Sequence, residues 1–162
     1  MSRSAKRPAW LSDEQQRVWQ AYMRVQLQLS YEMNRQLQSD NELSLSDYHV
    51  LHALSDSPDG CLRITALATR IGWERSRVSH QSRRMQKRGL VDLALASDDR
   101  RVTVVSLTAS GWETVRAAAG AHVALVRRMF FDGLAPDLLE PLTVALEQIH
   151  GHMTELDAIR PR

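Results

Sequence analysis

Residues 64–91 read ITALATRIGWERSRVSHQSRRMQKRGLV, and this stretch predicts two short helices joined by a sharp turn. Gly72 ends the first helix, because glycine reaches the left-handed conformation that closes a helix without a steric penalty. The second helix is expected to begin near Glu74 or Arg75 and to end at about Arg88. The first helix has one apolar face, formed at the i, i+3, i+4, i+7 spacing by Ile64, Leu67, Ala68 and Ile71.

The outward face of the second helix combines hydroxyl groups with guanidinium groups. Val78 and Met85 mark the opposite face, with Gln81 and Ser82 between them. Arginine presents a planar fork to guanine edges, and serine or histidine can bond to a base or a phosphate, so this helix can enter a DNA major groove. The alternative is a solvated basic face, which the turn and the hairpin on either side disfavour. The candidate DNA contacts are Arg75, Ser76, Arg77, Ser79, His80, Arg83, Arg84 and Lys87.

The segment after the second helix predicts a β-hairpin. Apolar residues alternate along 91–95 and again along 102–106, where Val102 and Val104 are the apolar positions, and the polar tip 97–101 separates the two runs. Two helices followed by a hairpin form a winged helix. Arg100 and Arg101 at the tip are therefore candidate DNA contacts, because an inserted arginine reads a narrow minor groove. The alternative is a merely soluble hairpin tip.

The flanking regions predict helices with more apolar surface than the central module can cover. A capping box, Ser12 to Gln15, opens a helix that extends to about residue 37, and a second helix covers roughly 46–55. A third is expected from Ala109 to about Phe131, and a last helix opens near Pro136 and is kinked or restarted at Pro141.

The domain organisation follows from these elements: a flexible basic arm (1–10), a dimerisation helix (11–45), a winged helix-turn-helix (46–108) and further dimerisation helices (109–162). The predicted fold is therefore mainly α with a small β-hairpin wing. A homodimer would cover the apolar faces of the end helices. It would also present two recognition helices to a pseudo-palindromic operator with half-sites about 10 bp apart.

Charge is concentrated in the central module. Residues 63–101 contain ten Lys and Arg and four Asp and Glu, a net charge of +6, whereas the rest of the chain carries −4. This distribution is typical of a protein that neutralises phosphates with one module. A winged helix that binds only proteins is the alternative, and it would not require this concentration of charge.

Other classes of protein find less support in the composition. No apolar run approaches a membrane span and the first ten residues lack the apolar core of a signal peptide, so a cytoplasmic location is expected. A single cysteine, Cys61, cannot form an internal disulfide framework. The sequence offers no base–nucleophile pair and no phosphate loop, so neither an enzyme nor a cofactor is predicted.

The chain resembles the MarR family of transcriptional regulators over nearly its whole length. The resemblance is carried by residues 67–91 (LATRIGWERSRVSHQSRRMQKRGLV), the wing pattern 99–104 (DRRVTV) and the following LTASG at 107–111. It implies a homodimeric winged-helix protein that binds operators, usually as a repressor, with its recognition helix at 75–88. Arg101 would be the wing residue that enters the minor groove.

Three positions depart from the usual pattern of the family. Gln81 and Ser82 stand where the family is usually more apolar, and Glu74 replaces a common serine cap and puts a negative charge near the phosphates. By the same resemblance, Asp99 would help to hold the wing.

The resemblance also implies an effector site, since many relatives bind small aromatic or phenolic anions between the dimer helices and the winged helix. An aromatic wall with one arginine or histidine suits a flat carboxylate. The alternative is that these aromatics are core residues and that the regulator has no effector. The candidate ligand-binding residues are Trp19, Tyr22, Met23, Arg24, Tyr48, His49, His52 and His122.

A metal site or a redox sensor is less well supported. His49 and His52 share a helical face, but zinc would need further ligands such as Cys61 or His122, and no CxxC or HExxH is present. No metal is therefore predicted. Cys61 is a weak candidate for a peroxide sensor, with Arg63 the only nearby cation in the sequence.

Overall fold

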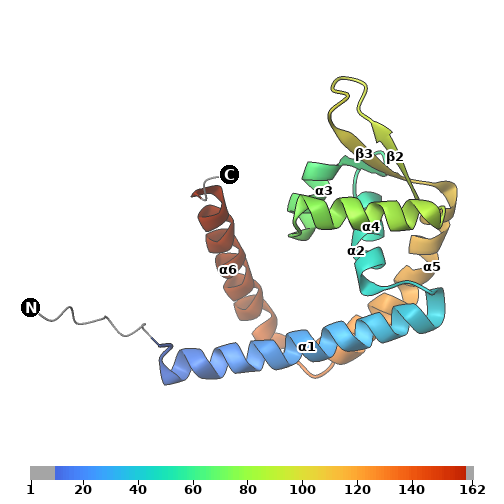
Figure 1. The fold of residues 1–162 in the computed structure, drawn as a ribbon. Helices are drawn as coiled ribbons and strands as arrows, with labels where there is room; N and C mark the ends of the chain where they lie inside the picture. Colours follow the sequence, from blue (N-terminus) through green and yellow to red (C-terminus); the bar gives the residue numbers. More distant parts are fainter. Residues whose placement is uncertain (1–9, 160–162) are drawn as a thin grey trace, which may run out of the picture. The chain divides into compact units, whose positions relative to one another are not determined.

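The computed structural model describes residues 10–159, and it is mainly α-helical with one small antiparallel sheet, as the sequence predicts (Figure 1). Residues 1–9, most of the predicted basic arm, lie outside the described residues. The chain forms two compact units, Met1–Val123 and Ala124–Arg162. The elements are α1 (Asp13–Asn41), α2 (Leu45–Ser55), β1 (Cys61–Arg63), α3 (Ile64–Ile71), α4 (Arg75–Lys87), β2 (Val91–Leu95), β3 (Thr103–Leu107), α5 (Ala109–Val126) and α6 (Leu139–Ile159).

Helices α3 and α4 form the predicted helix-turn-helix. Gly72 caps α3 in the left-handed conformation, with φ 67° and ψ 32°, which a residue with a Cβ rarely adopts. Glu74 is the N-cap of α4, but its side chain makes no capping hydrogen bond. The turn between the helices therefore depends on glycine, and the first turn of α4 is left with backbone N–H groups available to a ligand.

Helix α1 is longer than predicted, because it continues to Asn41 instead of ending near residue 37. It begins at the expected capping box, in which Ser12 and Gln15 bond to each other's backbone N–H groups. At its other end, Glu42 adopts the left-handed conformation (φ 54°) and caps the helix. A second capping box opens α2, with Ser44 as its N-cap.

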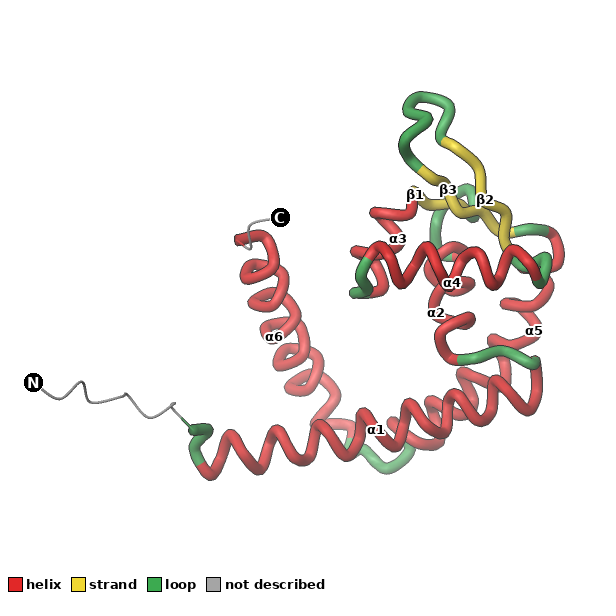
Figure 2. Tube along the Cα trace, viewed as in Figure 1, coloured by secondary structure: helices red, strands yellow, loops and turns green. Residues whose placement is uncertain are grey.

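The sheet has the strand order β1-β3-β2, and the β2–β3 hairpin projects beyond the helices of the first unit (Figure 2). The third strand, β1, lies immediately before α3 and pairs with β3. In the hairpin, Leu93 pairs with Val105 and Leu95 with Thr103. The predicted apolar phase of the second strand is wrong: Val105 is fully buried, whereas Val102 and Val104 are only partly buried. Valines occupy both phases here, and pairing with β2 selects between them.

The core of the first unit lies between α2, α3, α4 and the sheet. Its members are apolar side chains from α2, α3, α4, β2 and β3, together with the end of α1 and part of α5, so removing water from them stabilises the arrangement that carries α4. The largest fully buried apolar side chains are Leu37, Leu43, Leu51, Leu54, Leu67, Met85, Val50, Val78, Val91 and Val105.

The carboxyl-terminal unit contains the end of α5 and α6. A π-helical turn at Arg127–Phe131 follows α5, which therefore ends as an α-helix earlier than the expected Phe131. A 3-10 turn, Pro136–Leu138, precedes α6. Pro141 lies in the first turn of α6, where its missing N–H breaks no hydrogen bond, so the helix restarts before this proline. Among residues 10–159, no helix is long and apolar enough to cross a membrane.

Candidate nucleic-acid interface

Helix α4 presents its basic side chains outward. Val78 and Met85 are fully buried against the core, with Ser82 buried between them, so the opposite face is fixed toward solvent. Ser79 is half-buried. The other candidate contacts on α4 are exposed, namely Arg75, Ser76, Arg77, His80, Arg83, Arg84 and Lys87. The orientation predicted for this helix therefore agrees with its burial pattern.

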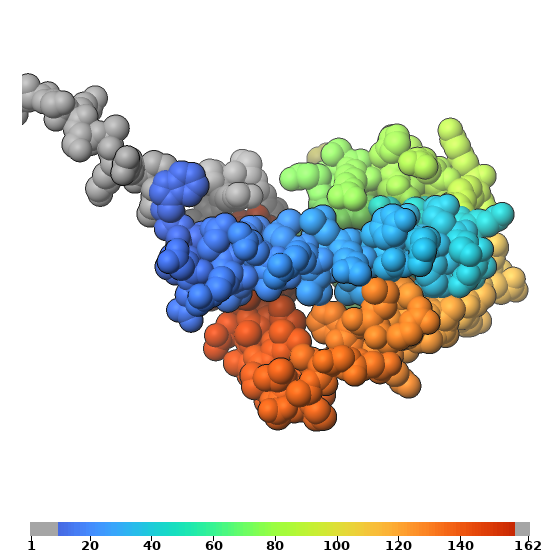
Figure 3. Space-filling model, turned by 90° about the horizontal axis from the view of Figure 1, so that it is seen from below, coloured from blue at the N-terminus to red at the C-terminus, as the bar shows by residue number. Residues whose placement is uncertain are grey.

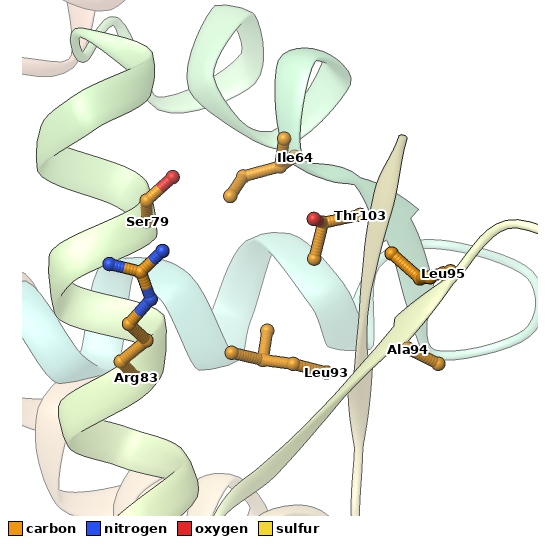
Figure 4. Close-up of a pocket in the computed structure, with 7 residues that line it drawn as sticks. All are labelled: Ile64, Ser79, Arg83, Leu93, Ala94, Leu95 and Thr103. Carbon is orange, nitrogen blue, oxygen red and sulfur yellow. The ribbon is translucent and has the colours of Figure 1, made fainter. Parts of the chain in front are cut away.

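A cleft of about 230 Å³ separates α4 from the wing. On the α4 side, Ser79 and Arg83, one helical turn apart, point into it (Figure 4). On the wing side, it is lined by Leu93, Ala94, Leu95 and Thr103, with Ile64 at one end. A hydroxyl and a guanidinium thus face an apolar wall, and this combination fits a sugar-phosphate backbone passing between helix and wing.

An arginine on α4 is held in place by the turn before it. The Arg77 guanidinium carbon lies 3.9 Å from the centre of the Trp73 ring, within the range of a cation–π contact. His49 of α2 meets the same tryptophan edge-on, with ring centroids 6.3 Å apart. Burial lowers the pKa of His49, as do the nearby charges of His52 and Arg77. Trp73 was not singled out in the sequence, because it precedes the N-cap of α4 and so lies outside the helical spacing that relates side chains on one face.

One acidic residue ties the wing to the body of the module, and a second orders the tip of the wing. Asp98 pairs with Arg63, which lies at the end of β1 and immediately before α3. This pairing lowers the pKa of the Asp98 carboxyl. The Asp99 carboxylate accepts a hydrogen bond of 3.0 Å from the backbone N–H of Arg101. Arg100 and Arg101 are exposed at the tip. Arg63 is therefore paired with the wing.

A second polar network underlies α4 and was missed in the sequence. The buried carboxylate of Asp47, on α2, accepts hydrogen bonds from Gln81 Nε2 (2.6 Å) and Arg88 Nη1 (2.9 Å). It also accepts bonds from the backbone N–H and the hydroxyl of Ser44. Arg88 Nη2 reaches the Glu42 carbonyl at 2.7 Å. Gln81, a departure from the family pattern, thus has a defined internal partner.

Three of the predicted ligand-binding residues come together in a separate groove of about 350 Å³ between α2 and α5. The rings of Tyr48 and His122 have centroids 4.3 Å apart, and those of Tyr48 and His52 are 5.8 Å apart. Burial, followed by the charges of His52 and His49, lowers the pKa of His122, while burial and nearby Asp56 raise that of Tyr48. The sequence did not identify Trp112 and Arg116, which also line this groove.

The other predicted ligand-binding residues lie outside this groove. On α1, the rings of Trp19 and Tyr22 have centroids 5.5 Å apart, and both side chains are about half exposed. Arg24 is exposed, whereas Met23 is partly buried. His49 faces Trp73 instead. Within residues 10–159, no three His, Cys, Asp or Glu side chains are grouped to hold a metal ion, so the four possible zinc ligands do not converge.

Comparison with known proteins identifies the family of this chain. The MarR family model matches residues 42–102, which cover most of the predicted module at 46–108. The structure of AbsC, a MarR family transcriptional regulator from Streptomyces coelicolor, is 38% identical and has a TM-score of 0.85, and the match covers 91% of this chain and 99% of that one. The chain belongs to the MarR family of transcriptional regulators.

Two further transcriptional regulators, the first of them a MarR family member, have similar structures. Sco3205 from Streptomyces coelicolor, solved in complex with DNA, is 34% identical, with a TM-score of 0.83 and coverage of 90% of this chain and 91% of that one. The transcriptional regulator BldR from Sulfolobus solfataricus is 26% identical, with a TM-score of 0.71 and coverage of 84% and 96%. A comparison with curated protein sequences gave no match.

Proposed function

We propose that this MarR-family regulator is a homodimeric, sequence-specific DNA-binding repressor. The observation that carries the proposal is the outward face of α4, where arginines and hydroxyls lie beside a cleft that ends at the wing. Arginine forks suit guanine edges and phosphates, and the helix is wide enough to fill a major groove. The relative Sco3205, whose structure contains DNA, supports DNA as the ligand.

The proposed contacts divide by groove. The α4 residues serve the major groove and its flanking phosphates, with Ser79 and Arg83 at the cleft. Arg101 enters the adjacent minor groove while Arg100 contacts phosphate, and Asp99 holds the tip through the Arg101 backbone. The major-groove set is Arg75, Ser76, Arg77, Ser79, His80, Arg83, Arg84 and Lys87.

The homodimer is supported by the apolar surface of the end helices. Along α1, Val18, Leu27 and Tyr31 are each at least 60% exposed, and Figure 3 shows one face of this helix uncovered along most of its length. On α6, Ile149 and Met153 are more than half exposed. Exposed apolar surface of this extent marks an interface, and a two-fold axis would place two copies of α4 on half-sites about 10 bp apart.

A small aromatic anion is the proposed effector. Its site is the groove between α2 and α5, where Tyr48 and Trp112 offer flat apolar surfaces and Arg116 offers a positive charge. The Arg116 guanidinium lies 5.2 Å from the centre of the Trp112 ring. Trp19, Tyr22, Met23 and Arg24 would complete the site only if α1 of a second copy approached it.

Binding to the DNA upstream of the protein's own gene tests the proposal, against scrambled DNA of equal length at several salt concentrations. Preference for the upstream fragment that persists near physiological salt supports specific recognition. Equal and strongly salt-sensitive binding to both fragments would mean phosphate contacts alone. No binding at low salt would contradict the proposal and favour a winged helix that binds only proteins. The same assay, repeated with phenolic acids, tests the effector.

A further inference from the structure

The carboxylate of Asp47 lies at a junction of three helices. Asp47 is 5% exposed, and burying a carboxylate costs free energy unless hydrogen-bond donors surround it. The donors come from two directions: Ser44 from the start of α2, and Gln81 with Arg88 from α4. The capping box of α2 needs only the bonds between Ser44 and Asp47. The two bonds from α4 are additional, and they fix α4 against α2.

The same junction extends to α1. The Arg88 guanidinium is forked, with Nη1 on Asp47 and Nη2 on the carbonyl of Glu42, the residue that caps α1. Nearby, the Leu45 N–H donates to Asn34 Oδ1 of α1 at 2.9 Å. A continuous set of hydrogen bonds therefore joins the end of α1, the start of α2 and the carboxyl-terminal half of α4.

We propose that Asp47 is a positioning residue for DNA recognition, acting through Gln81 and Arg88 to set the direction of α4 relative to α1. The inference rests on the proposed function, in which α1 contributes to the dimer and α4 reads DNA. The junction then determines the spacing and angle of the two recognition helices. Gln81 and Arg88 contribute to operator binding without touching the operator.

The competing explanation is that Arg88 contacts a phosphate directly. Its side chain is 42% exposed and belongs to the basic module, so charge alone does not separate the two roles. Geometry separates them, because a forked arginine that holds Asp47 and Glu42 cannot be replaced by lysine, which is a single point charge. A phosphate contact, in contrast, largely tolerates lysine.

The experiment measures operator affinity, its salt dependence and its dependence on half-site spacing for Asp47→Asn, Arg88→Lys and Gln81→Met. The control is Asp92→Asn, which removes the same charge from an exposed site on β2. Removing a negative charge near DNA should by electrostatics alone strengthen binding slightly, and this is the result expected for the control. Asp47→Asn should instead weaken binding by about tenfold, the effect of one charge-assisted hydrogen bond, with an unchanged salt slope.

Spacing separates positioning from mere stability. The wild type should discriminate strongly between the native operator and one with a single base pair inserted between half-sites, whereas Asp47→Asn and Arg88→Lys should discriminate less. A purely structural role would lower the melting temperature and leave this discrimination unchanged. If Asp47→Asn does not fold, Arg88→Lys and Gln81→Met carry the test, because both leave the Asp47–Ser44 cap in place.

Two results would overturn the inference: Asp47→Asn binding as tightly and as selectively as Asp92→Asn, or Arg88→Lys matching the wild type while Arg88→Ala lowers the salt slope by about one, as a lost phosphate contact does. Failure of the proposed function is recognised separately. In that case the wild type itself does not prefer operator DNA, and Arg83→Ala has no effect.

Discussion

Helices α1 and α4 expose faces of opposite character. On α4, apolar side chains such as Val78 are buried and arginines are exposed, whereas the only buried residue of α1 is Leu37 and large apolar side chains such as Trp19 and Leu27 face solvent. Exposed charge is stable in water, so the outer face of α4 needs no cover in the free protein. Exposed apolar surface is unfavourable in water, so α1 needs cover at all times. This contrast is the reason that we propose DNA as the partner of α4 and a second copy of the chain as the partner of α1.

The largest expected effect comes from charging the apolar face of α1. Val25→Glu places a carboxylate on a half-exposed apolar position, which should prevent dimerisation because the interface would bury an unpaired charge. Operator affinity should then fall by about a hundredfold or more, since two linked half-site contacts become independent. Light scattering coupled to gel filtration and a binding titration measure the two effects.

The control for this change is Gln26→Glu, which adds the same charge at the next exposed position of α1. It should remain dimeric and bind the operator normally. If Val25→Glu stays dimeric and keeps its affinity for the operator, then the apolar face of α1 is not the dimer interface.

The next largest effect is expected on α4. Arg83→Ala removes a guanidinium that faces the cleft between helix and wing, and should weaken operator binding by about ten- to a hundredfold. If its partner is a phosphate, the salt slope should also fall by about one; if it is a base, the loss should be confined to one operator position. Arg17→Ala, the same loss of charge on exposed α1, should have little effect. Equal losses for both variants would mean that only total charge matters.

A smaller effect is expected from the side chain that orders Arg77. Trp73→Ala removes the cation–π contact and should weaken DNA binding several-fold. Without this contact, the Arg77 side chain is not ordered in the free protein, so its conformational entropy is lost when DNA binds. A double-mutant cycle with Arg77→Ala, measured by fluorescence anisotropy, should be non-additive. Additive losses would show that Trp73 and Arg77 act independently.

The smallest effect is expected on the inner face of α4. The Ser82 hydroxyl is fully buried and has no hydrogen-bond partner among the residues that the structure describes. Ser82→Ala should therefore raise the free energy of unfolding by about 0.5–1 kcal/mol, measured in urea, while leaving operator affinity unchanged. Destabilisation would indicate that this hydroxyl has a partner in solution.

Local sequence was sufficient for the features that depend on neighbouring residues. Helix periodicity correctly assigned the outer face of α4, and the glycine at 72 correctly marked the turn. Local patterns failed where a feature depends on residues far apart in the sequence. The phase of β3 is set by β2, and Asp47 finds its donors 34 and 41 residues away, so neither was visible in a local pattern. The Trp73–Arg77 contact is local in the sequence, but Trp73 precedes the helix, so helical spacing did not predict it.

The proposed dimer places two copies of α4, each with its wing, on one operator. Hydroxyl-radical footprinting can detect both copies on DNA selected from a random pool by the wild-type protein. We expect two symmetric protected tracts about 10 bp apart, centre to centre, with flanking minor-groove protection that disappears in Arg101→Ala. A single asymmetric tract, or flanking protection that persists without Arg101, would contradict it.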